Sequence, residues 1–309
     1  MRHRGPWTGL RVASRLAAAA SVALIAGCSW FGESEKPPLP GERVSALQLN
    51  RQLNVDPELA DTDVILPAPY VNEAWAQPGG NQTHAMYHLK AGDAALQQIW
   101  SVDIGASADD ENRLLAEPVV ADNAIFAMDA DSVVSAYNTA DGERLWRADL
   151  TPDDEDDNLF GGGIAWVDDK LIVTTPFAKV FALNAKTGEV IWEAAAPAPM
   201  RSAPAVSDGR IFVITIDNQL VVYALDDGRK LWSNAGVEEA AGLLGGTTPA
   251  VDGNLVVAAY TSGELLAFDV TDGRSMWTDS LAGGARGNAI ATLTDIRGRP
   301  VIDRDYVIA

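Results

Sequence analysis

Two histidines, His84 and His88, are the residues whose type and spacing come closest to a metal site in this 309-residue chain. A spacing of four residues would place both on one face of a helix. A zinc site normally takes three or four protein ligands, and neither an HExxH motif nor a group of cysteines accompanies the pair. The sequence therefore predicts no metal site in the segment that contains them, residues 66–89.

An acidic run, residues 152–158, is the second place where cation chemistry could arise. Calcium loops use an Asp-x-Asp-x-Asp-Gly framework with a distal glutamate, which this run, PDDEDDN, lacks. We interpret it as a solvated loop between strands. The chain also has no G-x-S-x-G nucleophile motif and no phosphate-binding loop. The sequence thus predicts no enzyme activity and no bound cofactor.

The one cysteine of the chain, Cys28, has a sequence context that predicts covalent modification. Four arginines come first, and the apolar run 16–27 follows them. Its 12 residues are too few for a spanning helix, which needs about 20, so residues 1–27 are predicted to be a secretory signal. The end of that run, Ile25-Ala26-Gly27-Cys28, fits a bacterial lipobox. We therefore expect cleavage before Cys28 and acylation of its sulfur.

The charge of the chain restricts what the mature protein can bind. Removing residues 1–27 takes away four arginines and no acidic residue, which leaves 19 basic and 43 acidic residues and a net charge of −24. So acidic a protein is a poor ligand for nucleic acid or for an anionic lipid surface. Acyl chains on Cys28 would supply the membrane address, and Ser29, which is not aspartate, favours the outer membrane.

The elements that must position these residues come from an internal repeat. A glycine precedes a tryptophan by four residues in four places, Gly142–Trp146, Gly188–Trp192, Gly228–Trp232 and Gly273–Trp277. Counting 28 residues back from the tryptophans gives Pro118, Ile164, Pro204 and Pro249. This constant register indicates a true repeat with a period of 40 to 46 residues.

One repeat has the pattern of four short strands. In the third unit the strands are expected at residues 203–206, 210–215, 219–225 and 230–233, with an Asp208-Gly209 turn between the first two. Units of four strands with this period predict an all-β propeller. We interpret the repeated tryptophans as core residues between blades, because a tryptophan dominates the apolar area buried locally.

The repeat also predicts the domain boundaries. We expect a signal peptide at 1–27, a proline-rich tether at 28–65 and the propeller at 66–309. Trp100 has the context of a fourth strand without the first three, and residues 300–307 begin a further unit. Four complete blades and partial ones are therefore expected, and we interpret the chain as a C-terminally truncated piece of a longer protein.

The repeat VFALNAKTGEVIW, at residues 180–192, resembles that of quinoprotein-like propellers, which have eight blades. With the lipobox and the segments KPPLPGER, WAQPGGNQTHAMYHL and DIRGRPVID, the chain resembles the BamB family of outer-membrane protein assembly factors. The resemblance implies a non-enzymatic scaffold lipoprotein of the β-barrel assembly (BAM) complex. It would lie at the periplasmic face of the outer membrane and dock on the periplasmic domains of BamA and other barrel-assembly subunits. Unfolded outer-membrane proteins are further expected partners, because their strands could pair with blade edges.

The resemblance also implies docking loops, residues 239–247 and 288–299. Leu243 fits a family position with an apolar contact, and Asp295 fits one with an acidic contact. Leu244 stands where the family often has an arginine, and Arg297 stands where it has a second aspartate. For Leu243 and Leu244, burial within the loop and contact with a partner are equally open alternatives.

A dehydrogenase dependent on pyrroloquinoline quinone and calcium, or another propeller that binds a ligand, is the alternative function. Such enzymes often carry a vicinal cysteine pair, and some carry a haem motif C-x-x-C-H. With Cys28 as its single cysteine, this chain has neither. The sequence therefore favours a scaffold.

Overall fold

The computed structural model describes residues 62–63, 65–92, 95–108, 113–153, 159–239, 245–280 and 295–309. The chain divides into two units, residues 1–64 and 65–309. Of the first unit only two residues are among those described, so the architecture that follows is that of the second. The predicted sites Cys28, Leu243 and Leu244 lie outside the described residues.

The described part of the second unit is all-β and contains four antiparallel sheets of four strands and one of two, here called blades 1 to 5. Blades 1 and 2 contain β1 (Val119–Ala121), β2 (Ala124–Met128), β3 (Val133–Asn138), β4 (Arg144–Asp149), β5 (Gly163–Val167), β6 (Lys170–Thr174), β7 (Lys179–Asn184) and β8 (Val190–Ala195). Blades 3 to 5 contain β9 (Ala205–Ser207), β10 (Arg210–Ile214), β11 (Gln219–Ala224), β12 (Lys230–Ala235), β13 (Ala250–Asp252), β14 (Leu255–Ala259), β15 (Glu264–Asp269), β16 (Ser275–Ser280), β17 (Val301–Asp303) and β18 (Tyr306–Ile308).

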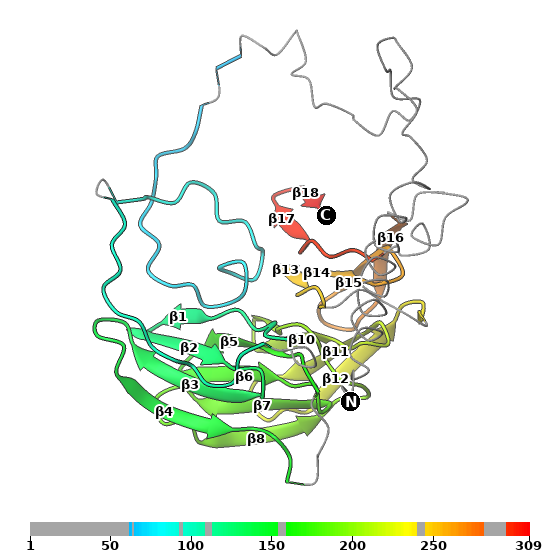
Figure 1. Ribbon diagram of the computed structural model, residues 1–309. Coiled ribbons are helices and arrows are strands. Elements are labelled where there is room, and N and C mark those ends of the chain that lie inside the picture. Colours follow the sequence, from blue (N-terminus) through cyan, green and yellow to red (C-terminus); the bar gives the residue numbers. More distant parts are fainter. Residues whose placement is uncertain are drawn as a thin grey trace, which may run out of the picture. The chain divides into compact units, whose positions relative to one another are not determined.

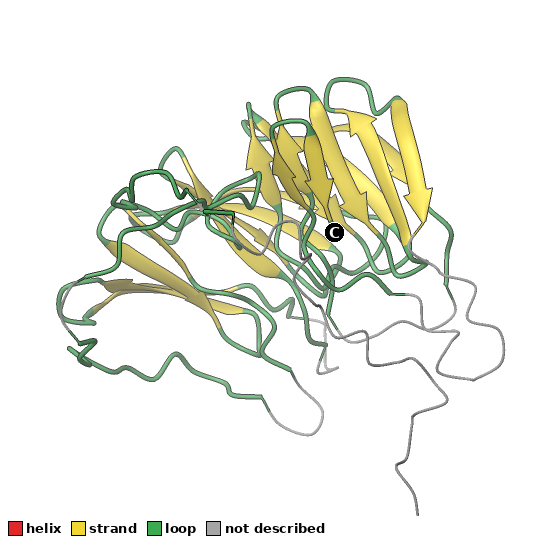
Figure 2. Ribbon diagram, turned by 90° about the horizontal axis from the view of Figure 1, so that it is seen from above, coloured by secondary structure: helices red, strands yellow, loops and turns green. Residues whose placement is uncertain are grey.

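Each complete blade is a meander in which consecutive strands are neighbours (Figure 1). The first strands of successive blades lie beside each other, since β1 contacts β5, β5 contacts β9, β9 contacts β13 and β13 contacts β17. We call these first strands the inner strands. Figure 2 shows the strands of successive sheets fanned out beside one another. The predicted propeller architecture is thus confirmed, and in the third unit the strand bounds agree with those expected to within two residues.

Turn chemistry explains why the first hairpins of blades 1, 2 and 3 form. The two residues between β1 and β2, Asp122 and Asn123, have φ angles of 48° and 59°, and the pair between β9 and β10, Asp208 and Gly209, has 46° and 71°. Positive φ at both central residues is the requirement of a type I′ turn, whose twist matches that of the flanking strands. The predicted Asp208-Gly209 turn therefore closes the hairpin of blade 3.

The core lies between blades, because both faces of the middle strands are covered. Phe126 of blade 1 packs in one cluster with Ile164 and Leu183 of blade 2. Equivalent clusters join blade 2 to blade 3, blade 3 to blade 4, and blade 4 to Ile302 of blade 5. The fourth strands, such as β12, alternate between partly buried and exposed residues, so they form the outer wall.

Just before each cassette tryptophan, the pairing between the third and fourth strands of its blade shifts register. The pairing of β3 with β4 shifts between Ala136 and Tyr137, directly beside the pair Ala136–Trp146, and the other three complete blades shift at the equivalent step. A bulge inserts an extra residue and re-aims the neighbouring side chain. Here it accompanies a ring that is turned toward the next blade.

The rings of Trp146, Trp192 and Trp232 lie on the turn glycine of the following blade. A Cβ atom on Gly188 would stand 2.5 Å from Cε3 of Trp146, and the indole Nε1 of Trp146 donates to the carbonyl oxygen of Ala185 at 2.8 Å. The same contact joins Trp192 to blade 3 and Trp232 to blade 4. Trp100, although no strand is assigned around it, makes this contact with Gly142 of blade 1. Trp277 packs instead against the cluster that contains Ile302.

Candidate functional site

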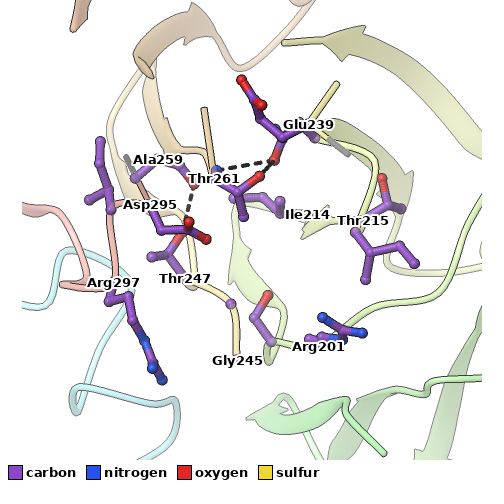
Figure 3. A pocket seen from close by; sticks show the side chains of 15 residues that line it. Arg201, Ile214, Thr215, Glu239, Gly245, Thr247, Ala259, Thr261, Asp295 and Arg297 are labelled. Atoms are coloured by element: carbon purple, nitrogen blue, oxygen red, sulfur yellow. Dashed lines mark hydrogen bonds between the residues drawn. The ribbon is translucent and has the colours of Figure 1, made fainter. Parts of the chain in front are cut away.

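The loops that lead into the inner strands of blades 4 and 5 meet at a pocket, called the loop pocket here. The predicted residues Asp295 and Arg297 both line it, together with Glu239 and Thr247 (Figure 3). Leu243 and Leu244 belong to the same loop as Glu239, but their positions lie outside the described residues. The structure thus brings together the two polar positions that the sequence selected.

A buried asparagine ties together the walls of the loop pocket. The Oδ1 atom of Asn218 accepts hydrogen bonds from the backbone N–H and the Oγ1 of Thr261, at 3.2 and 3.1 Å. Its Nδ2 donates to the carbonyl oxygen of Val237 at 2.7 Å. Asn218 is 1% exposed, and it belongs to the turn between β10 and β11. One side chain therefore links a turn of blade 3 to the loops of blade 4.

A second tie holds the floor of the pocket. The hydroxyl of Thr247 donates to the carbonyl oxygen of Ala259 at 2.7 Å, and Thr247 is 3% exposed. The loop before β13 is thereby fixed to the end of β14. Such buried and satisfied polar contacts hold a single arrangement, because breaking one leaves a polar group without a partner.

One of the two arginines that line the pocket was predicted from the sequence, and the other was missed. Arg297 was selected, and its Nη2 lies 2.9 Å from the point where a Cβ of Gly245 would stand. Arg201 was missed; its guanidinium lies 5.4 Å from the centroid of the Phe160 ring. Neither guanidinium has an ion-pair partner among the residues that the structure describes. No spacing or motif singles out Arg201, because it approaches the site only through the packing of blade 3 on blade 4.

An adjoining cavity of about 420 Å³, the inner cavity, shares Arg201 and Arg297 with the loop pocket. It is lined further by Arg299 and Glu117, which form an ion pair, and burial lowers the pKa of Arg299. Three arginines against one glutamate make this cavity cationic, in a chain whose net charge is −20. A positive cleft on an acidic protein favours the entry of acidic groups.

The two histidines face different backbone carbonyls. The Nδ1 of His84 lies 2.7 Å from the carbonyl oxygen of Pro300, whereas the Nδ1 of His88 lies 2.7 Å from that of Pro67. Burial lowers the pKa of His84, and the charge of Arg299 acts in the same direction against the hydrogen bond to Pro300. Across the described ranges, no three His, Cys, Asp or Glu side chains are gathered in a way that could hold a metal ion.

The remaining predicted features are only partly within the described residues. Of the acidic run 152–158, residues 154–158 are not among them. In the part of the chain that is described, there is no helix of the length and apolar character needed to cross a bilayer.

The repeated four-stranded blades and their tryptophan contacts define a propeller of the PQQ-like class. The family model described as outer membrane protein assembly factor BamB matches residues 85–156 and 130–309, which together exceed half of the chain. The chain therefore belongs to this family, and the resemblance found in the sequence is confirmed. None of the curated proteins matches the chain.

Solved structures of two kinds share the fold. The crystal structure of BamB from Moraxella catarrhalis is 20% identical with a TM-score of 0.55, over 67% of this chain and 60% of that one. A quinohemoprotein alcohol dehydrogenase from Pseudomonas putida is 18% identical with a TM-score of 0.52, over 68% and 40%. A europium-containing methanol dehydrogenase is 14% identical with a TM-score of 0.56, over 68% and 49%. The chain thus spans 60% of the BamB structure and less than half of either dehydrogenase.

Proposed function

We propose that this protein is a non-enzymatic scaffold of the BAM complex, which docks on the periplasmic domains of BamA and assists the folding and insertion of outer-membrane proteins. The observation that carries the proposal is membership of the BamB family over residues 85–309. In this proposal residues 1–27 are removed, Cys28 is lipidated, 28–65 are a tether and 66–309 are the propeller. The protein is then held at the periplasmic face of the outer membrane.

The loop pocket is the proposed docking surface. Asp295 and Arg297 present charges of both signs at its edge, and the ties at Asn218 and Thr247 keep its walls in place before a partner arrives. A preorganised surface loses less entropy on binding than a mobile one does. Leu243 and Leu244 are proposed as the apolar contacts at the centre of the interface.

Co-purification with BamA tests the docking surface. Leu243→Asp is expected to reduce the BamA recovered from mild-detergent extracts of outer membranes by about tenfold, since apolar residues at the centre of an interface carry much of its energy. The matched control is Val190→Asp, which places the same charge at an exposed apolar residue of the outer strand β8. Undiminished BamA recovery with Leu243→Asp, in a protein that melts like the unmodified one, would rule out this docking surface.

A quinoprotein dehydrogenase is the second candidate, favoured by the likeness to the solved alcohol dehydrogenase. Among the described residues that line the inner cavity, Glu117 is the one carboxylate, and it is paired with Arg299. A dehydrogenase needs a general base close to its substrate, so these residues favour the scaffold over the enzyme. Quinone absorbance in the purified protein, together with dye-linked alcohol oxidation, would support the enzyme; recovery of BamA without either supports the scaffold.

A further inference from the structure

Residues 75–83, called the axial segment here, contact all five blades although they precede the first of them. The segment forms no strand, yet it has hydrogen bonds to the inner strand of every blade. Its contacts follow the order of the chain: residues 75, 76 and 77 meet blades 1, 2 and 3, and residues 82 and 83 meet blades 4 and 5.

The blades present the same backbone group to this segment each time. The donors are the N–H groups of the residue two positions after Pro118, Ile164, Pro204, Pro249 and Pro300, namely Val120, Trp166, Val206, Val251 and Ile302. The acceptors are the carbonyl oxygens of Trp75, Ala76, Gln82 and Thr83 and the Oε1 of Gln77, at distances of 2.7 to 2.9 Å. The repeat that builds the blades therefore also builds a row of equivalent donors along their inner edges.

Gln77 differs from the other four because its carbonyl oxygen is already used. That oxygen accepts the N–H of Gly80 at 2.8 Å and closes a turn with Pro78 and Gly79 in the middle. Proline followed by a residue with φ of +78° fits a type II turn. The side-chain amide of Gln77 replaces the carbonyl: its Oε1 accepts from Val206 N–H and its Nε2 donates to Val206 C=O, both at 2.8 Å.

The segment is also braced from within and at its end. The Oδ1 of Asn81 accepts from the N–H and the hydroxyl of Thr83, at 3.0 and 2.9 Å. His84 continues the contact to blade 5 through the carbonyl oxygen of Pro300. Gln77, Pro78 and Gly80 are all buried, so the bonds of the Gln77 amide to Val206 are removed from competing water.

We propose that the inner edges of the blades form a binding site for one extended peptide, and that the axial segment is the ligand of this site, supplied by the chain itself. The segment contacts one inner strand after another, and at blade 1 the contact is reciprocal, because Trp75 and Val120 each donate to the carbonyl oxygen of the other. Spacing comes from the Gln77-Pro78-Gly79-Gly80 turn, which carries the chain from blade 3 to blade 4. Specificity comes from Gln77, whose side chain alone can satisfy both backbone groups of Val206.

The site can be separated from its ligand by one cut. Gly92 is exposed, and no atom lies within 4 Å of the position where its Cβ would stand, so a protease recognition sequence can follow it. Trp100 holds the chain to blade 1 beyond the cut, through its contact with Gly142. After cleavage, the N-terminal fragment is held to the described blades by the contacts of the axial segment and of the residues beside it.

The experiment uses the intact protein, extracted in mild detergent, with this sequence inserted after Gly92 and cleaved to completion. We expect the N-terminal fragment to co-elute with the propeller on size exclusion. An excess of a synthetic peptide of residues 70–90 should displace it, and the peptide should then co-elute. Loss of the fragment in native buffer while the propeller keeps its melting temperature would overturn the proposal, and so would a retained fragment that the peptide cannot displace.

A pair of variants in the same segment tests the assigned contact. Gln77→Ala removes the two side-chain bonds to Val206 and should weaken retention of the cleaved fragment and binding of the matching peptide by about tenfold. Gln82→Ala is the control, because Gln82 meets Val251 through its main-chain oxygen, which alanine keeps. Equal retention of the two variants would refute the role of Gln77, and the peptide titration reports this even where the intact variant folds poorly.

Discussion

Each cassette glycine must be small for two separate reasons. Gly188 has a φ of +75°, which disfavours any side chain, and the ring of Trp146 occupies the space that a Cβ would take. Gly209 has nearly the same φ, +71°, but nothing stands within 4 Å of its Cβ position. Comparing substitutions at these two positions therefore separates the energetic cost of backbone strain from the cost of crowding the Trp146 ring.

Substituting alanine at these two positions measures the tryptophan contact. Gly209→Ala should lower the free energy of unfolding by about 1 kcal/mol, from left-handed backbone strain alone. Gly188→Ala should lower it by roughly 3 kcal/mol or more, since overpacking against the Trp146 ring adds to that strain. Chemical denaturation of both variants checks the difference. Equal losses would mean that the ring moves aside without cost.

His84 should make the stability of the protein depend on pH. Its Nδ1 must donate to the Pro300 carbonyl, so in the neutral ring the buried Nε2 carries no proton, and this atom has no hydrogen-bond partner among the described residues. Because the folded pKa lies below the unfolded value of about 6.5, the stability from the neutral ring is present above that pH. It is lost as the pH falls, because the unfolded chain then binds a proton that the folded chain resists.

Denaturation midpoints between pH 8 and pH 5 test this expectation. The contribution of His84 to the slope is at most about 1.4 kcal/mol per pH unit, the value for one proton. His84→Gln should flatten the profile below pH 6.5, whereas the control His88→Gln should retain it. A profile that is unchanged in His84→Gln would assign the acid sensitivity to other groups.

At the scale of elements, the sequence predicts the blades well because their information is local. Strand alternation, the Asp208-Gly209 turn and the register from Gly228 to Trp232 all lie within one repeat. The axial segment is different: Gln77 and its partner Val206 are 129 residues apart, and the segment has no periodicity. In the sequence of the axial segment, the pair Gly79-Gly80 predicts a turn but none of the contacts with the blades. The donors that it meets become equivalent only after the blades have formed.

The loop pocket shows the same limit. Asp295 and Arg297 could be selected from a family pattern, but Arg201 and Asn218 could not, because they reach the pocket from blade 3 through packing. Asn218 in particular resembles any turn asparagine in the sequence. Its φ of 59° explains why asparagine is tolerated there, and its three side-chain bonds explain why it is buried.

Asn218→Gly tests the tie between blades 3 and 4. Glycine accepts the positive φ of this position, so the loss reports the side-chain bonds and the cavity rather than backbone strain. We expect the free energy of unfolding to fall by about 2 to 3 kcal/mol, because the partners at Thr261 and Val237 lose their bonds. Hydrogen exchange at the Thr261 amide should quicken in the same variant. Unchanged exchange there would show that water replaces the side chain without cost.

At the scale of the whole molecule, charge and anchoring are linked. Residues 28–309 carry 43 acidic and 19 basic side chains, so an anionic membrane surface repels them. Under the proposed function, attachment would come from acyl chains on Cys28 or from a partner that is itself in the membrane. Each buried CH₂ of an acyl chain contributes about 0.8 kcal/mol, which makes several chains a stable anchor.

Cys28→Ala separates these two sources of attachment. The substitution lies outside the propeller, so we expect the melting temperature of the repeat domain to be unchanged. If lipid holds the protein, the variant should move from the outer-membrane fraction to the soluble periplasm, and BamA recovered with it should fall because the two are no longer confined to one surface. If Cys28→Ala stays with the outer membrane, and adding Leu243→Asp to it releases the protein, the docking surface is what attaches it. If the protein stays with the outer membrane when Cys28→Ala and Leu243→Asp are combined, neither the lipid nor the loop pocket is its attachment.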